Sequence, residues 1–179
     1  MLNIKIICVG KLKERFYTDA SKEYEKRLSG YCKLEVLEIS EHRLPTGSEQ
    51  PAIRNSQLTV SVVNAKSNSA QIEIALDKER SAINRHIPPG ATTVALCIES
   101  REMDSKGLSE YLTECAVRGA SRLCFIVGGS LGLHDDIKKG ADLQLSMSKM
   151  TFPHNLARIM LLEQLYRAFN IAEGGKYHK

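Results

Sequence analysis

The chain has 179 residues, with 25 lysines and arginines against 21 aspartates and glutamates, which gives a formal net charge of +4. This length suits one domain, and a hydrophobic share of 42% is enough to fill one core. The near balance of charge excludes a disordered polyelectrolyte, and no apolar run approaches the roughly 18–20 residues of a membrane span.

The first part of the chain predicts a strand, a helix and a second strand. Residues 3–9 are a short β-branched apolar run that stops at Gly10, as a buried strand would. Residues 15–29 carry an apolar side chain every four positions, which is typical of an amphipathic helix. Residues 33–39 alternate polar and apolar side chains, which indicates a strand with one wet face.

The pattern weakens over residues 40–70, where Pro, Gly, Ser, Asn and Gln are frequent. We interpret this stretch as a loop-rich excursion that contains at most a short strand at residues 58–63. Residues 71–87 then have the spacing of a helix, and the Pro88-Pro89-Gly90 run ends it.

From there strands and helices alternate regularly. The remaining predicted strands cover residues 92–98, 122–127 and 143–146. The remaining predicted helices cover residues 105–118, with Ser105 as the cap, 134–140 and 154–172. Such alternation indicates an α/β fold, a mostly parallel sheet with helices on both faces. We expect a single domain over residues 1–179, with residues 173–179 as a polar functional tail.

Ligands of parallel sheets bind beyond the carboxyl ends of the strands. Three loops qualify: those after Ile98, after Val127 and after Ser146. The loop after Val127 is Gly128-Gly129-Ser130-Leu131-Gly132, in which glycine allows a ligand to approach the backbone closely. Its spacing is neither a dinucleotide fingerprint nor a P-loop, so a ligand loop and a plain tight turn are equally good readings.

The loop after Ser146 runs through Met147, Ser148, Lys149, Met150, Thr151, Phe152 and Pro153. Its hydroxyls, aromatic ring and thioethers suit a purine with a sulfur-bearing chain, but an ordinary helix start has the same features. His154 follows as either a general base or a structural residue. Tyr177 and His178 either belong to a mobile tail or fold over a ligand.

The last predicted helix is apolar around most of its circumference, so it is either central or part of a subunit interface. We favour the interface and therefore expect a homodimer. The five cysteines show no C-x-x-C spacing, and Cys8, Cys97 and Cys124 lie within apolar runs, so we expect buried hydrophobes rather than disulfides. The histidines lack metal-ligand spacing, and we expect no metal site.

Several of these motifs occur together and in one order. The shared segments are Val9 to Lys13, Tyr24 to Leu28, Phe125 to His134, Ser146 to His154, Glu163 to Phe169 and Tyr177 to Lys179. In this combination the chain resembles the bacterial ribosomal RNA large subunit methyltransferase H family, of the SPOUT class. Residues 1–40 and 90–179 carry the resemblance. One departure is Ser100-Arg101, where the family has glycine and then lysine.

The resemblance implies an α/β domain with a C-terminal trefoil knot, active as a homodimer in the cytoplasm. It implies S-adenosyl-L-methionine as the cofactor and methylation of N3 of a pseudouridine in 23S rRNA, within assembled ribosomes. The residues that would hold the cofactor are Leu96, Gly128, Gly129, Ser148, Lys149, Met150, Thr151, Phe152 and Pro153. Those that would handle the substrate are His154, Arg158, Tyr177 and His178.

Two other functions compete with this one. A nicotinamide-dependent enzyme of the same fold class lacks its dinucleotide fingerprint here. A non-catalytic RNA-binding or ribosome-associated module would keep the basic tail but would need no cofactor loop. Cofactor binding separates these alternatives.

Overall fold

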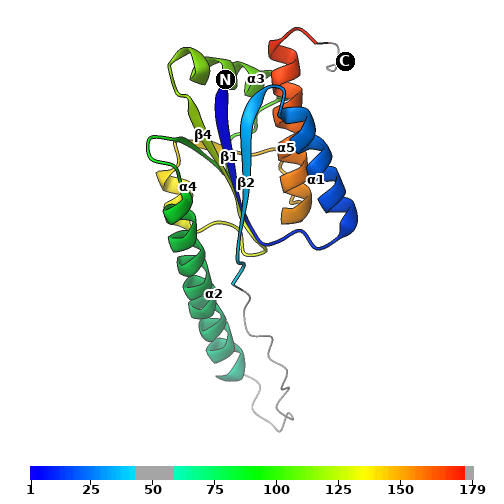
Figure 1. Ribbon diagram of the computed structural model, residues 1–179. Helices are drawn as coiled ribbons and strands as arrows, with labels where there is room; N and C mark the ends of the chain where they lie inside the picture. Colours follow the sequence, from blue (N-terminus) through cyan, green and yellow to red (C-terminus); the bar gives the residue numbers. More distant parts are fainter. Residues whose placement is uncertain (43–58, 176–179) are drawn as a thin grey trace.

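Figure 1 shows the computed structural model, which describes the backbone of residues 1–42 and 59–175 and the side chains of residues 1–42 and 69–175. The strands of this part are β1 (Leu2–Val9), β2 (Cys32–Ile39), β3 (Thr92–Leu96), β4 (Arg122–Val127) and β5 (Leu143–Leu145). The helices are α1 (Arg15–Leu28), α2 (Thr59–His86), α3 (Ser105–Val117), α4 (Asp135–Gly140) and α5 (His154–Ala172). The predicted alternation of strands and helices is confirmed.

The strands form one parallel sheet in the order β2-β1-β4-β3-β5. β1 and β4 are central and covered on both faces, which explains their unbroken apolar runs. Because all strands point the same way, their carboxyl ends meet at one edge of the sheet. This edge carries the three loops that the sequence singles out.

Helices cover both faces of the sheet, as predicted (Figure 1). On one face α5 packs against both α1 and α3, and Leu161, Leu162 and Leu165 are fully buried there. On the other face α2 and α4 contribute Ile83 and Ile137 to a second apolar cluster. Within this fold α5 is a central helix with neighbours on several sides, which accounts for much of its unusually broad apolar surface.

Two predictions in the middle of the chain are wrong. Residues 59–63 are not a strand but the first turns of α2, which also replaces residues 59–70 of the expected loop-rich excursion. β-branched residues cost a helix only a few tenths of a kcal/mol each, and an isolated strand has no ladder to join. Residues 43–58 lie outside the described residues.

The cap of α3 is also corrected. Asp104, not Ser105, precedes the helix, and its carboxylate accepts a hydrogen bond from Gly107 N at 2.7 Å. The hydroxyl of Ser105 instead donates to Gln164 Oε1 at 2.6 Å and joins α3 to α5. Cys8, Cys97 and Cys124 are buried free thiols, as expected from their apolar surroundings.

Candidate cofactor pocket

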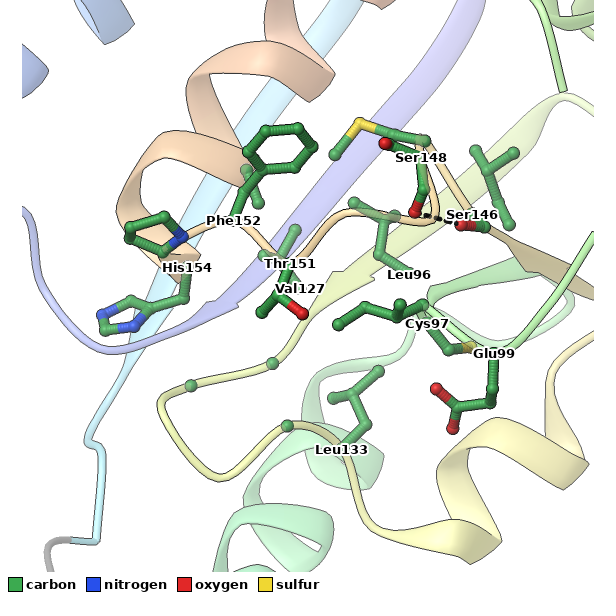
Figure 2. Close-up of a pocket in the computed structure, with 18 of the residues that line it drawn as sticks. Leu96, Cys97, Glu99, Val127, Leu133, Ser146, Ser148, Thr151, Phe152 and His154 are labelled. Carbon is green, nitrogen blue, oxygen red and sulfur yellow. Dashed lines mark hydrogen bonds between the residues drawn. The ribbon is translucent and has the colours of Figure 1, made fainter. Parts of the chain in front are cut away.

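A pocket of about 800 Å³ opens at the carboxyl edge of the sheet. Its walls are the loop after β3, the glycine loop after β4 and the loop between β5 and α5 (Figure 2). Small-molecule sites usually measure roughly 300–1,000 Å³ and are mainly apolar with a few polar groups. The pocket therefore has the size and the position of a cofactor site in a parallel sheet.

Most of the residues predicted to bind a ligand line this pocket. They are Leu96, Gly128, Gly129, Ser148, Met150, Thr151, Phe152, Pro153 and His154. Lys149 lies between lining residues, but its exposed side chain is not part of the wall. Arg158 does not line the pocket either, and Tyr177 and His178 lie outside the described residues.

The glycine loop folds back tightly on itself. A Cβ atom on Gly128 would lie 2.6 Å from the backbone of Gly132, and one on Gly129 would lie 2.9 Å from Val9 Cγ1. Gly132 N donates to Gly129 O at 3.1 Å and closes the turn. The two adjacent glycines are therefore required by close packing of the loop against itself and against β1.

A carboxylate from the segment after β2 holds this loop. Glu41, just after β2, accepts hydrogen bonds through Oε1 from Ser130 N at 2.9 Å and from Ser130 Oγ at 2.6 Å. The same oxygen is 3.1 Å from the position that a Gly129 Cβ would take. The sequence analysis missed Glu41, because nothing near it in the sequence marks it as part of the site.

The segment that carries Glu41 is itself held in place by α2. Glu79 of α2 is only 2% exposed, and its Oε1 accepts a hydrogen bond from His42 N at 2.8 Å. Burial raises the pKa of the Glu79 carboxyl, an effect that the hydrogen bond from His42 opposes and the nearby Glu41 charge increases. Glu79, whose carboxylate costs free energy to bury, thus positions the segment that carries Glu41, and Glu41 positions the glycine loop.

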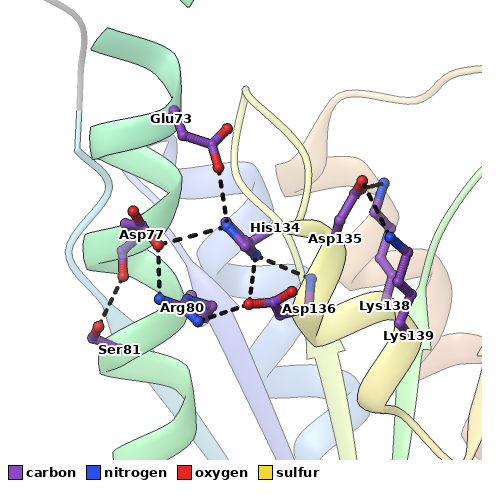
Figure 3. Close-up of polar contacts among 9 residues, drawn as sticks. All are labelled: Glu73, Asp77, Arg80, Ser81, His134, Asp135, Asp136, Lys138 and Lys139. Atoms are coloured by element: carbon purple, nitrogen blue, oxygen red, sulfur yellow. Dashed lines mark hydrogen bonds and ion pairs between the residues drawn. The ribbon is translucent and has the colours of Figure 1, made fainter. Parts of the chain in front are cut away.

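The far end of the glycine loop is also joined to α2, through His134 (Figure 3). His134 Nδ1 accepts from Asp136 N at 3.0 Å and caps α4, so its Nε2 carries the proton in the neutral ring. That Nε2 lies 3.3 Å from Glu73 Oε1 and 3.6 Å from Asp77 Oδ1. Arg80 completes the cluster by pairing with Asp77 and Asp136.

Hydrogen bonds within the β5–α5 loop give it a defined shape. Ser146 Oγ donates to Ser148 O at 2.9 Å, and Met150 N donates to Ser148 Oγ at 3.0 Å. The loop is joined to the one after β3, since Ser146 N donates to Arg101 O at 3.1 Å. Ser100 Oγ donates to Cys97 O at 3.0 Å, a hydrogen bond within the loop after β3.

Glu99 lies on the opposite side of the pocket from His154 (Figure 2), and it forms an ion pair with Lys138. Lys138 Nζ lies 2.7 Å from Glu99 Oε1 and 2.9 Å from Asp135 Oδ1. The hydrogen bond from Lys138 lowers the pKa of the Glu99 carboxyl. Sequence reasoning missed both Glu99 and Lys138, although Glu99 lies just beyond the predicted strand end.

His154 begins α5 and lines the pocket. Its Nε2 would lie 3.3 Å from a Cβ atom on Gly10, the residue that directly follows β1 and has φ at +93°. Only glycine both adopts this φ readily and leaves room for the imidazole. The arrangement brings a titratable ring to the junction of the pocket, β1 and α5.

Arg158, one turn further along α5, has a different environment. It is 7% exposed, and its Nη1 pairs with Glu38 Oε1 at 2.5 Å. Glu38 Oε1 also accepts a hydrogen bond from Leu12 N at 3.2 Å. In the described chain Arg158 is therefore a buried link between α5, β2 and the connection from β1 to α1.

The described residues contain no cluster of three or more His, Cys, Asp or Glu side chains suited to a metal ion. No helix among them is long and apolar enough to cross a membrane.

The chain was compared with known proteins. A family profile described as "Predicted SPOUT methyltransferase" matches residues 2–178. Three proteins named "Ribosomal RNA large subunit methyltransferase H" align over 178 residues, which is 99% of this chain and 100% of each relative. They come from Clostridium botulinum at 42% identity, Clostridioides difficile at 41% and Streptococcus pyogenes at 39%. The chain therefore belongs to the SPOUT methyltransferases and, within them, to the ribosomal RNA large subunit methyltransferase H family.

Proposed function

We propose that the protein methylates N3 of a pseudouridine in 23S rRNA with S-adenosyl-L-methionine as the methyl donor. The observation that carries this proposal is the pocket, in which three loops from distant parts of the chain meet at the sheet edge beside His154. Membership of the methyltransferase family and the names of the relatives supply the reaction class and the kind of RNA.

The described residues fit such a cofactor. The pocket volume of about 800 Å³ holds a nucleoside with an amino-acid chain, and its walls combine apolar side chains with hydroxyls. Leu96, Gly128, Gly129 and the loop from Ser148 to Pro153 would hold it, with Lys149 contributing its backbone at most. Once bound, S-adenosyl-L-methionine would supply an electrophilic methyl group, and the protein's task would be to position the two reactants.

The N3 atom must lose its proton as the N–C bond forms. We propose His154, Tyr177 and His178 as the groups that could accept this proton, directly or through water. Of these three, His154 is the one that lines the pocket among the described residues. Arg158 is too buried to be offered as a direct substrate contact, so we assign it a positioning role through Glu38.

We further propose that the C-terminal half is knotted, that the active form is a cytoplasmic homodimer, and that the substrate is the assembled ribosome. These expectations come from the family resemblance. Sedimentation at several protein concentrations tests the dimer, and comparison of intact subunits with free 23S rRNA tests the substrate.

The decisive experiment uses ribosomes that lack the modification and S-adenosyl-L-methionine labelled in its methyl group. Label found at N3 of one pseudouridine, mapped by nuclease digestion and mass spectrometry, is the expected result. Cofactor binding without label in the ribosome would mean another substrate. If the ribosome gains no label and the protein binds no cofactor, the proposal is overturned, and a non-catalytic RNA-binding module is favoured.

A further inference from the structure

The connection between β1 and α1 carries two exposed lysines, and the first turn of α1 carries an exposed aromatic ring. Lys11 and Lys13 are exposed, and neither forms an ion pair within the described residues. Phe16, at the start of α1, is 64% exposed. Two exposed lysines and an exposed aromatic ring therefore lie within six residues of one another in the sequence, at positions 11–16.

This connection is held firmly at the sheet edge. Its first residue, Gly10, contacts His154 closely, as the distance of 3.3 Å from a built Cβ shows. Its middle is bonded through Leu12 N to Glu38, the partner of the buried Arg158. Figure 1 shows the connection passing the first turn of α5 on its way to α1. The lysines are therefore presented from an anchored backbone that begins next to His154, a residue that lines the pocket.

The chemistry of these side chains suits unpaired RNA. Lysine ammonium groups bind phosphates, and exposed aromatic rings stack on splayed bases. Phe16 already lies against Tyr17, with ring centroids 4.2 Å apart, so its orientation is supported from one side. Arg15 is not assigned to this surface, because its Nε lies 3.5 Å from Asp19 Oδ2 and it shares its charge with that carboxylate.

We propose that Lys11, Lys13 and Phe16 form an RNA-binding surface that holds the substrate strand beside the pocket, with Arg158 and Glu38 anchoring the loop beneath it. The proposal rests on the proposed function, since it assigns the substrate of the same site to a particular face. The lysines would contact phosphates and the ring of Phe16 would stack on a base next to the target.

The test measures binding of a fluorescein-labelled, single-stranded 20-nucleotide RNA of mixed sequence over a range of salt concentrations. The double variant Lys11→Ala/Lys13→Ala should bind several-fold more weakly, and the slope of log K against log salt should decrease by about 1.4. The matched control, Lys26→Ala/Lys33→Ala, removes the same charge from exposed lysines toward the opposite edge of the sheet and should change neither value beyond a small uniform effect.

The aromatic contact has its own variants. Phe16→Ala should weaken RNA binding at least about fivefold, Phe16→Leu should weaken it similarly, and Phe16→Tyr should restore it, because stacking requires a ring. Affinity for S-adenosyl-L-methionine should stay unchanged in all of them. A change of oligomeric state in Phe16→Ala would instead identify the ring as a subunit contact and overturn its role in RNA binding.

The outcomes separate this surface from the proposed function. If the unaltered protein methylates ribosomes and binds the RNA but the lysine variants bind it equally well, the surface is wrong and the function stands. If the unaltered protein neither binds RNA nor transfers a methyl group, the proposed function has failed and the surface with it.

Discussion

The carboxylate of Glu41 accepts two hydrogen bonds from Ser130, one from the backbone N–H at 2.9 Å and one from the hydroxyl at 2.6 Å. Ser130 is the central residue of the glycine loop that forms one wall of the pocket. Glu41 follows β2, whereas Ser130 follows β4. These two strands lie on either side of β1 in the sheet. A residue outside the pocket wall thereby sets the shape of that wall.

The first prediction tests this hydrogen-bonded pair. Glu41→Ala removes both bonds and should weaken binding of S-adenosyl-L-methionine about tenfold, which corresponds to about 1.4 kcal/mol. Ser130→Ala removes only the hydrogen bond from the hydroxyl and should weaken cofactor binding about two- to threefold. Glu41→Gln keeps an acceptor and should fall between the parent and the alanine variant. Calorimetry measures the affinities.

The control for this series is Glu110→Ala, which removes an exposed carboxylate from α3. The affinity of this variant for S-adenosyl-L-methionine should equal that of the parent protein. Equal affinities for Glu41→Ala and Glu110→Ala would show that the glycine loop keeps its shape without Glu41.

A second prediction concerns the glycines of the loop. Gly128→Ala would bring a Cβ within 2.6 Å of backbone atoms, which can yield only if the loop moves, so we expect about 1–3 kcal/mol of destabilisation and loss of cofactor binding. Gly129→Ala meets the side chains of Val9 and Glu41 and should cost less, whereas Gly129→Val should abolish binding. Thermal denaturation and calorimetry measure both effects.

Gly140 supplies the matched control. It ends α4, and a Cβ there would meet nothing within 4 Å. Gly140→Ala should leave cofactor affinity unchanged and raise stability slightly, because alanine favours the helix. Normal cofactor binding by Gly128→Ala would contradict the tight-loop geometry.

The third prediction concerns the buried carboxyl of Glu79. Burial raises its pKa above the ordinary value of 4.5, so the folded protein keeps this proton to a higher pH than the unfolded chain does. The free energy of unfolding should therefore fall as pH rises from about 4.5 through the raised pKa. Glu79→Gln keeps an acceptor for His42 N and has no proton to lose, so its Tm relative to the parent should increase from pH 4 to pH 7.

Thermal melts at pH 4, 5, 6 and 7 check this expectation, with the exposed Glu110→Gln as the control that should show no such trend. A difference in Tm of roughly 2–4 °C would correspond to about 1 kcal/mol for a domain of this size. A constant difference between Glu79→Gln and the parent at every pH would mean that the carboxyl titrates normally in the fold.

A fourth prediction concerns the thiols. All five cysteines are buried, and burial raises the pKa of Cys8 to about 12 and that of Cys124 to about 11. A thiol reagent such as dithionitrobenzoate should therefore find no fast-reacting cysteine in the native protein at pH 8, and five after unfolding in guanidinium. Cys97 lines the pocket, so fast modification there, prevented by the cofactor, would show that the pocket wall opens.

The fifth prediction concerns the C-terminal tail. Deleting Tyr177 to Lys179 should leave cofactor affinity unchanged and abolish methyl transfer, because the family resemblance assigns these residues to the substrate. Calorimetry and the labelled-ribosome assay measure the two properties separately. Transfer by the shortened chain would remove Tyr177 and His178 as proton acceptors and leave His154 as the candidate.

The amino-acid sequence by itself determined the main elements and the location of the pocket. Periodicity gave residues 122–127 and 154–172 with the bounds of β4 and α5, because buried strands and long helices carry strong local patterns. The parallel alternation then placed the loops after β3, β4 and β5 at one sheet edge. The strand predicted at residues 58–63 was wrong, because residues 59–63 belong to the long helix α2, whose continuation overrides their local β-propensity.

Only the tertiary structure decided how side chains from distant parts of the chain support that pocket. Glu41 meets Ser130 across 89 positions of sequence, and Arg158 meets Glu38 across 120. These contacts depend on the strand order, which places β2 beside β1 and β1 beside β4, and no local pattern encodes that order. The burial of Arg158, which makes it an anchor rather than an exposed cation, follows from the same packing of α5 on the sheet.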